Sequence, residues 1–340
     1  MDDLLPPPAY SPHDPHPRNA NPSSFPPRAS AQAGSRGPVP YLEESISTVA
    51  RKQPRQGKSG SSTSNRNNAS VNVSLGQPLY EAVYQRDPET VEMLLQNYAD
   101  ANYCPSGSKP ALTKAVSNHD TGIARMLLEE GNPDLEAHPP GGKTALYTAV
   151  GDGSSDLVRL LLQYGANPNF KPSGGQPAIY KAYSNGNREI LWMLLDSEGI
   201  HVDAAPPGGS TTLYQAAEKE DREAVRAILS VGATVDAKPS GGVSAMYRAA
   251  VRGDLATTDM LLQCGAKVDV TPPGGTTALW HATKKCHAEM VRLLLKYGAD
   301  VNAKSPGGQT VLTRAVKNDK SKDRVILNML LEAQRIRGLV

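Results

Sequence analysis

The sequence predicts an all-α solenoid of short helical repeats behind an N-terminal tail rich in proline and serine. Two observations support this fold class. An apolar residue, usually leucine, recurs about every 33 positions after residue 73, and proline and glycine recur together on the same period. Before residue 73, the prolines are scattered irregularly among Ser, Asn and Arg. Periodic breakers delimit helices, whereas irregular ones are typical of a segment without a core.

The period is clearest in the recurring apolar residue and in the turn before it. A Pro-Pro-Gly-Gly sequence begins at Pro139, Pro206 and Pro272. The apolar residue, 33 or 34 positions after its predecessor, is Leu79, Leu112, Leu146, Ile179, Leu213, Met246, Leu279 and Leu312. We therefore expect about eight copies in residues 73–340, with the last acting as a C-terminal cap. Residues 1–72 are expected to form a disordered tail, because they are too polar to bury an apolar core.

One copy, residues 139–171, shows how its residues specify two helices. Proline and glycine together favour a tight turn, because proline fixes φ and glycine accepts a positive φ. Thr144 is placed to cap the first helix through its hydroxyl. The second helix is expected to stop at Gly165. Neither helix is long enough to be stable alone, so neighbouring copies must stack and share their apolar faces.

A period near 33 residues with a turn and two helices resembles the ankyrin-repeat family, whose first helix opens with a TPLHxA sequence. The resemblance covers nearly four-fifths of the chain. It implies a helix-turn-helix plus a β-hairpin-like finger in each repeat, and a groove that binds proteins. The finger tips here carry Pro, Ser and Gly where the family usually carries charges, so we expect recognition to involve the helices instead.

The composition indicates which partners and which cellular compartment to expect. The net charge is +2, from 36 Lys and Arg against 34 Asp and Glu, so no global field favours nucleic acid or a membrane. The three cysteines lack CxxC spacing, which is typical of a reducing compartment. The residues before Pro6 are acidic where a secretion signal needs basic ones. We expect a monomer in the cytoplasm or the nucleus, with no membrane insertion.

Catalytic and metal-binding motifs are weak. Gly142-Lys143-Thr144 imitates the end of a phosphate loop, but Ala137 stands where that loop needs glycine. His281, Cys286 and His287 form a metal-like cluster, although His281 and Cys286 do not share a helical face. No Ser/His/Asp set has a supporting motif. The sequence therefore predicts no enzyme, no catalytic residue, no cofactor and no metal.

A candidate binding groove follows from the first helices. Positions two, five and six after the repeat leucine share one helical face. They are mostly neutral in the first four copies and basic in the later ones. The predicted groove residues, including two on the fingers, are Lys238, Arg248, Arg252, His281, Lys284, Lys285, Lys304, Arg314 and Lys317. Such a groove suits an acidic segment of a client protein. The alternatives are an ordinary solvated surface and nucleic acid, which the lack of interleaved aromatic residues disfavours.

The tail contains two further candidate segments. Pro7-Pro8-Ala9-Tyr10 resembles the PPxY ligand of WW domains, in which Pro7, Pro8 and Tyr10 would make the contacts. A proline-rich tail also produces such a motif by chance. Residues 41–52 place apolar side chains on one helical face, so they predict a short helix that either remains a linker element or docks on a partner.

Together these patterns predict a scaffold or adaptor. The repeat groove would hold a client protein while the tail recruits a WW-domain partner such as a ubiquitin ligase. The alternative is a nuclear regulatory factor that binds a transcriptional or chromatin partner through the basic groove. The basic segment 51–58 is a weak import-like patch that would fit this alternative.

Overall fold

The computed structural model describes residues 64–238, 242–273, 275–318, 324–336 and 338, with side chains from Leu75 onward. All of them belong to the second of two units, which comprises residues 58–340. The PPxY motif and the predicted helix 41–52 lie outside the described residues. They therefore stay predictions.

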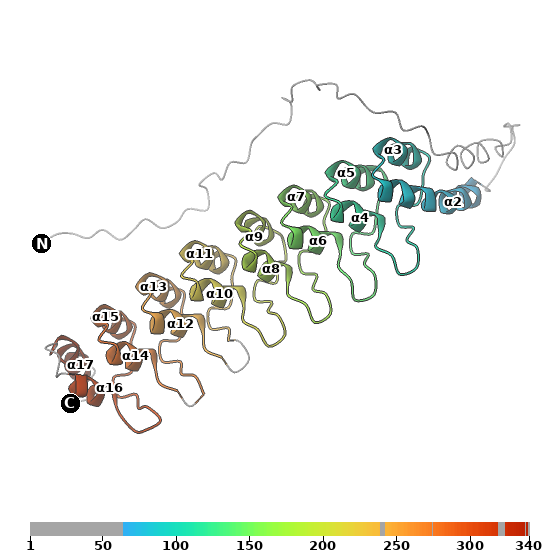
Figure 1. The fold of residues 1–340 in the computed structure, drawn as a ribbon. Coiled ribbons are helices and arrows are strands. Elements are labelled where there is room, and N and C mark those ends of the chain that lie inside the picture. Colours follow the sequence, from blue (N-terminus) through green and yellow to red (C-terminus); the bar gives the residue numbers. More distant parts are fainter. Residues whose placement is uncertain (1–63, 239–241, 274, 319–323, 337, 339–340) are drawn as a thin grey trace, which may run out of the picture. The chain divides into compact units, whose positions relative to one another are not determined.

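The described residues form helices that alternate between two layers (Figure 1). The first-helix layer contains α2 (Ser64–Gln85), α4 (Ala111–Ser117), α6 (Ala145–Asp152), α8 (Ala178–Ser184), α10 (Thr212–Glu218), α12 (Ala245–Arg252), α14 (Ala278–Lys284) and α16 (Val311–Asn318). The second-helix layer contains α3 (Pro88–Gln96), α5 (Thr121–Glu130), α7 (Ser155–Gln163), α9 (Arg188–Leu195), α11 (Arg222–Ser230), α13 (Leu255–Gln263), α15 (Ala288–Lys296) and α17 (Arg324–Ile336).

Each first helix packs against its own second helix and against the first helix of the next pair. This arrangement confirms the predicted all-α solenoid. Helix α2 starts at Ser64, upstream of residue 73, where the sequence analysis places the start of the repeats. The exact boundary between tail and repeats stays a prediction. No helix within the described ranges combines the length and apolar character needed to cross a bilayer.

Hydroxyl side chains start most of the central first helices, as the sequence analysis predicts for Thr144. Thr144 Oγ1 accepts a hydrogen bond of 3.3 Å from the Tyr147 N–H, which occupies one of the donors that a helix start leaves unpaired. The same contact, at the same distance, is made by the hydroxyls of Thr211, Ser244 and Thr277. The chain therefore enters each of these helices at a defined angle.

The fingers that connect successive helix pairs are tight turns. In the finger at Pro139, the Gly142 N–H donates to the Pro139 carbonyl over 2.7 Å, and Gly141 has a φ of +68°. A type II turn favours proline at its second position and needs a positive φ, usually supplied by glycine, at its third position. Among the described residues, β pairing in the fingers is limited to one bridge between Lys304 and Thr310. The predicted hairpin character is thus reduced, because a type II turn splays the strands that flank it.

The second glycine is fixed by packing in the fingers that begin at Pro139, Pro172, Pro206 and Pro272. A Cβ on Gly142 would lie 2.4 Å from Pro139 Cγ, and one on Gly209 would lie 2.4 Å from Pro206 Cγ. These separations are far shorter than the 3.5–4.0 Å at which carbon atoms attract each other. The proline ring that opens the finger therefore lies against the glycine that closes it.

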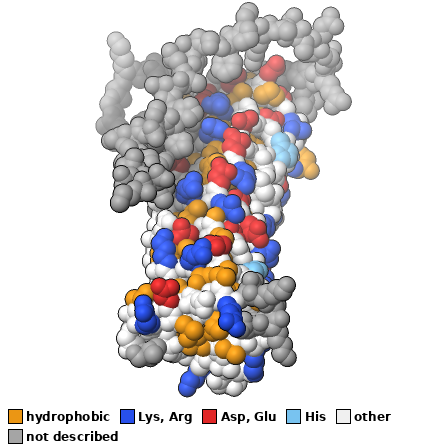
Figure 2. Space-filling model, turned by 90° about the vertical axis from the view of Figure 1, so that its left-hand side faces the viewer, with side chains coloured by type: hydrophobic (Ala, Val, Ile, Leu, Met, Phe, Trp, Pro, Cys, Tyr) orange, Lys and Arg blue, Asp and Glu red, His pale blue; other side chains and the backbone are white. Residues whose placement is uncertain are grey.

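The core lies between the two helix layers. The repeat leucine and its equivalents are almost completely buried in α2 through α14. The last helix pair differs, because Leu312 is only half-buried and Val316 is 58% exposed. Figure 2 faces this end of the stack and shows hydrophobic side chains gathered there. Large exposed apolar residues of α16 and α17 are Val316, Val325, Leu331 and Ile336.

A series of polar side chains ties each repeat to the next through the backbone. Asp203 is typical, because its carboxylate accepts hydrogen bonds from the N–H of Thr234, 31 residues later. The acceptors in this series are Asn102, Glu136, Asn169, Asp203, Asp236 and Asp269, and their shortest distances run from 2.6 to 3.1 Å. Charge-assisted bonds of this kind hold neighbouring repeats in register.

Candidate functional site

The predicted groove residues come from three consecutive first helices and two fingers. Arg248 and Arg252 lie in α12, His281 and Lys284 in α14, and Arg314 and Lys317 in α16. Lys285 directly follows α14, whereas Lys238 and Lys304 lie on exposed finger segments. The helical residues are thus brought onto neighbouring elements of one layer, as predicted.

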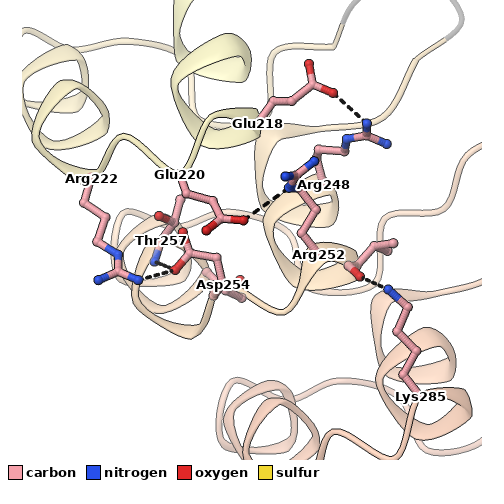
Figure 3. Close-up of polar contacts among 10 residues, drawn as sticks. Glu218, Glu220, Arg222, Arg248, Arg252, Asp254, Thr257 and Lys285 are labelled. Carbon is pink, nitrogen blue, oxygen red and sulfur yellow. Dashed lines mark hydrogen bonds and ion pairs between the residues drawn. The ribbon is translucent and has the colours of Figure 1, made fainter.

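The two arginines of α12 are already paired with carboxylates of the preceding repeat (Figure 3). Arg248 Nη2 lies 2.6 Å from Glu218 Oε1, and Arg252 Nε lies 3.4 Å from Glu220 Oε1. The positive charge predicted for this part of the groove is therefore largely cancelled. The sequence analysis missed Glu220 because this residue follows α10 in a left-handed turn, with φ of +59°, and not on the helix face considered.

Positive charge concentrates around Trp280. Lys284 Nζ lies 5.4 Å and Arg314 Cζ lies 5.7 Å from the centroid of the Trp280 ring, within the range of a cation–π interaction. Lys285 Nζ donates to the Val251 carbonyl over 2.6 Å, which places its charge at the end of α12 (Figure 3). We call this cluster the Trp280 patch. It consists of Trp280, His281, Lys284, Lys285 and Arg314.

His281 belongs to the patch but contributes less charge than its predicted role implies. Its ring makes edge contacts with Tyr247 and Trp280, at centroid distances of 6.0 and 5.4 Å. Burial, followed by the positive charges of Lys284 and Lys285, lowers the pKa of His281 from its ordinary value of 6.5. The imidazole is therefore mainly neutral at pH 7, and the fixed charge of the patch comes from the lysines and Arg314.

Two buried donor groups of the patch lack an acceptor. Trp280 Nε1 and Arg314 Nε are both inaccessible to solvent, and among the described residues neither has a hydrogen-bond partner. A buried donor without an acceptor costs about 1–3 kcal/mol. The patch thus combines cations, an indole ring and unsatisfied N–H groups, which is the chemistry of an anion-binding surface.

Comparison with known proteins identifies the repeats. A family model described as ankyrin repeats matches residues 79–172, 112–206 and 246–337, which together cover well over half of the chain. The chain belongs to the ankyrin-repeat family. The resemblance predicted from the sequence is confirmed, whereas the count of eight repeats stays a prediction.

One solved structure extends this assignment. The ankyrin-repeat chain is similar to the ankyrin repeat domain of Bcl-3, which is described as a unique member of the IkappaB protein family. The two share 27% sequence identity with a TM-score of 0.50, over 75% of this chain and 97% of that chain. No curated protein sequence matches significantly. The family and the similarity together support a role in protein–protein interaction.

Aromatic and basic side chains also meet in the earlier ankyrin repeats. Lys114 Nζ lies 4.2 Å from the centroid of the Tyr84 ring, and Lys219 Nζ lies 4.8 Å from that of Tyr183. The sequence analysis missed these pairs. The pairs join residues from successive repeats, so a motif within one repeat could not reveal them. In each pair the cation covers one face of the ring.

A small polar pocket of the ankyrin stack lies beside Tyr183. It is lined by Arg188, Lys219 and Asp221, and Arg188 Nη2 is paired with Asp221 Oδ2 over 2.9 Å. Burial and the charge of Asp221, opposed by Arg188, raise the pKa of the Tyr183 hydroxyl to about 12. A neutral phenol and a paired arginine offer an anion little, so this pocket is a weaker candidate site than the Trp280 patch.

His281, Cys286 and His287, which form the metal-like grouping in the sequence, lie in the same ankyrin repeats. Throughout the described ranges, no three His, Cys, Asp or Glu side chains lie close enough together to hold a metal ion. His287 instead lies against Gly253 of the preceding repeat, because a Cβ on that glycine would be 3.2 Å from the His287 ring. His287 therefore packs against the preceding repeat.

Proposed function

We propose that this ankyrin-repeat protein is an adaptor that binds an acidic segment of a client protein at the Trp280 patch. The observation that carries the proposal is the difference between neighbouring repeats. Arg248 and Arg252 face carboxylates of the protein itself. Among the described residues, by contrast, no carboxylate forms an ion pair with Lys285 or Arg314, so the positive charge of these two residues is available to a partner.

The physical advantage of such a patch is steering as well as contact. Opposite charges attract over about 10 Å at 0.1 M ionic strength and only about 3 Å at 1 M, so association is faster at low salt. Trp280 adds an apolar surface of the kind that dominates binding energy in protein interfaces. The client would thus be drawn by charge and held partly by the indole.

In the same proposal, the tail recruits a second protein. Pro7, Pro8 and Tyr10 would occupy a WW domain, which binds a polyproline II helix on aromatic ridges. A ubiquitin ligase with WW domains is one partner of this chemistry. The adaptor would work as a monomer in the cytoplasm or the nucleus.

The second candidate is a nuclear regulatory factor whose client is a transcriptional or chromatin protein. The similarity to the ankyrin repeat domain of an IkappaB family member favours this candidate. Affinity purification of the full chain and of a form without residues 1–63, followed by mass spectrometry, separates the two. WW-domain proteins lost with the tail support the adaptor, and nuclear factors retained by both forms support the regulator.

Charge reversal in the Trp280 patch tests the client site. Lys285→Glu with Arg314→Glu should weaken binding of an oligoglutamate peptide about tenfold or more, which is about 1.4 kcal/mol or more. Binding is measured by fluorescence anisotropy over a salt series. Lys285 is exposed but Arg314 is partly buried, so the melting temperature is measured in parallel to confirm that the repeats remain folded.

The matched control is Arg248→Glu with Arg252→Glu, which changes the net charge equally. Its effect on peptide affinity should be smaller, because Glu218 and Glu220 already cancel these arginines. Equal losses in both double variants would mean that the peptide senses net charge only. A flat salt dependence with no loss in either would identify the basic residues as ordinary solvated surface.

Loss of Tyr10 tests the tail. Tyr10→Ala should abolish capture of the full-length chain by a panel of purified WW domains, because the tyrosine pocket would be empty. Circular dichroism should be unchanged, since Tyr10 precedes every described helix. If the wild-type chain binds no member of the panel, Pro7-Pro8-Ala9-Tyr10 is a chance sequence.

A further inference from the structure

The Trp280 patch holds two cations beside one ring. Lys284 comes from α14 and Arg314 from α16, and each lies within about 6 Å of the same indole centroid. Both positive charges lie beside the same ring, and like charges repel each other. An anion that contacts both would remove the repulsion, and one with a double charge would remove more of it than a carboxylate.

The unsatisfied donors indicate how many acceptors the anion needs. Trp280 Nε1 and Arg314 Nε lack partners among the described residues, and both side chains are partly exposed. An acceptor that reached either N–H would supply the hydrogen bond that it lacks. Both a carboxylate and a phosphate monoester can bind an arginine through two parallel N–H groups, but the phosphate has a third terminal oxygen left for a second donor.

The surroundings of the patch favour a high negative charge on the ligand. Within the described part of the chain, no carboxylate forms an ion pair with Arg314 or Lys285, in contrast to Arg248 and Arg252. His281 is held mainly neutral at pH 7 by burial and by the charges of Lys284 and Lys285. The charges of Lys284 and Lys285 thus add to the effect of burial on the pKa of this imidazole.

From this geometry we infer that the Trp280 patch binds a phosphorylated serine or threonine of the client in preference to aspartate or glutamate. The inference rests on the proposed function and specifies its ligand. The phosphate would lie between the Arg314 guanidinium and the Lys284 ammonium, with the indole beneath. Phosphorylation of the client would then control its binding to the adaptor.

The test uses the full chain and three peptide libraries that differ at one fixed central residue: phosphoserine, serine or aspartate. Flanking positions are randomised, and retention on immobilised protein is measured. The phosphoserine library should be retained about tenfold more strongly than the aspartate library, and the serine library least of all. Equal retention of phosphoserine and aspartate would overturn this inference and leave the proposed acidic-segment site intact. Retention of none of the three would overturn both.

A conservative variant separates charge from geometry. Arg314→Lys keeps the charge but loses the two-pronged donor arrangement, so the preference for phosphoserine over aspartate should fall severalfold. Lys296→Gln, on the exposed surface of α15 in the second-helix layer, should leave the preference unchanged. If Arg314→Lys retains the full preference, Arg314 does not read the phosphate and this geometry is wrong. Circular dichroism of both variants confirms that the repeats remain folded.

Discussion

Replacement of Asp254 by alanine should lower the free energy of unfolding by about 2 kcal/mol or more, a large loss for one polar side chain. The Asp254 side chain is 1% exposed, although it carries a charge. Its Oδ1 accepts from the Thr257 N–H over 3.3 Å, which caps α13, and lies 3.0 Å from Arg222 Nη2 of the preceding repeat (Figure 3). Alanine would lose both contacts and leave a cavity.

The same contacts predict how the loss depends on pH. Burial raises the pKa of Asp254, but hydrogen bonds from Thr257 and the charge of Arg222 outweigh it and hold the pKa below its ordinary value of 3.8. The folded state thus binds the proton less readily than the unfolded state does. The stabilisation is fully present above about pH 4, the pKa of an unperturbed Asp, and is lost as the pH falls through the lower folded pKa.

Urea unfolding of wild type and Asp254→Ala at pH 7 and at lower pH measures both effects. Asp120→Ala is the matched control, because Asp120 caps α5 in the same way but is 26% exposed and lies 3.7 Å from Arg86. It should cost about 1 kcal/mol, the usual value of a helix cap. An equal cost for the two variants at pH 7 would show that burial of Asp254 adds nothing.

Replacement of Gly209 by alanine should destabilise the repeats by about 1–3 kcal/mol, the usual cost of forcing an atom into an occupied space. The new Cβ would lie 2.4 Å from Pro206 Cγ, and the proline ring has little freedom to move away. The finger must therefore open, which breaks the hydrogen bond from the Gly209 N–H to the Pro206 carbonyl. Differential scanning calorimetry measures the resulting fall in melting temperature.

The control for the finger is Ser173→Pro. Ser173 occupies the second position of its turn, where four other fingers already carry proline. Proline at a compatible position restricts the unfolded chain and commonly stabilises a protein by about 0.4–1 kcal/mol. If Gly209→Ala melts at the wild-type temperature, the contact between the proline ring and the second glycine does not constrain the turn.

The features predicted correctly from the sequence are those that depend on neighbouring residues in the chain. The cap at Thr144, the burial of the repeat leucines and the Pro-Gly-Gly turn each need only a few consecutive positions. The missed features join residues about 30 positions apart. Arg248 is paired with Glu218, and Lys114 lies over Tyr84, because the stacking offset brings these side chains together.

The candidate site illustrates the same limit. The sequence placed nine basic residues in one groove, and the structure brings the helical ones onto α12, α14 and α16. Their availability could not be predicted, because it depends on whether the preceding repeat supplies a carboxylate. Glu220 reaches Arg252 from a turn with a positive φ. The periodicity of a helix does not predict where the side chain of such a residue lies.

The structure of the fingers limits how their sequence can evolve. In the finger from Pro206 to Gly209, three of the four residues are constrained. The ring of Pro206 contacts Gly209, Gly208 has a positive φ, and Gly209 has no room for a Cβ. Mutations there are removed by loss of stability before they can be selected for a new partner. Exposed positions of the first helices carry no such penalty. Divergence in partner choice should therefore accumulate on these helices, while the fingers drift little.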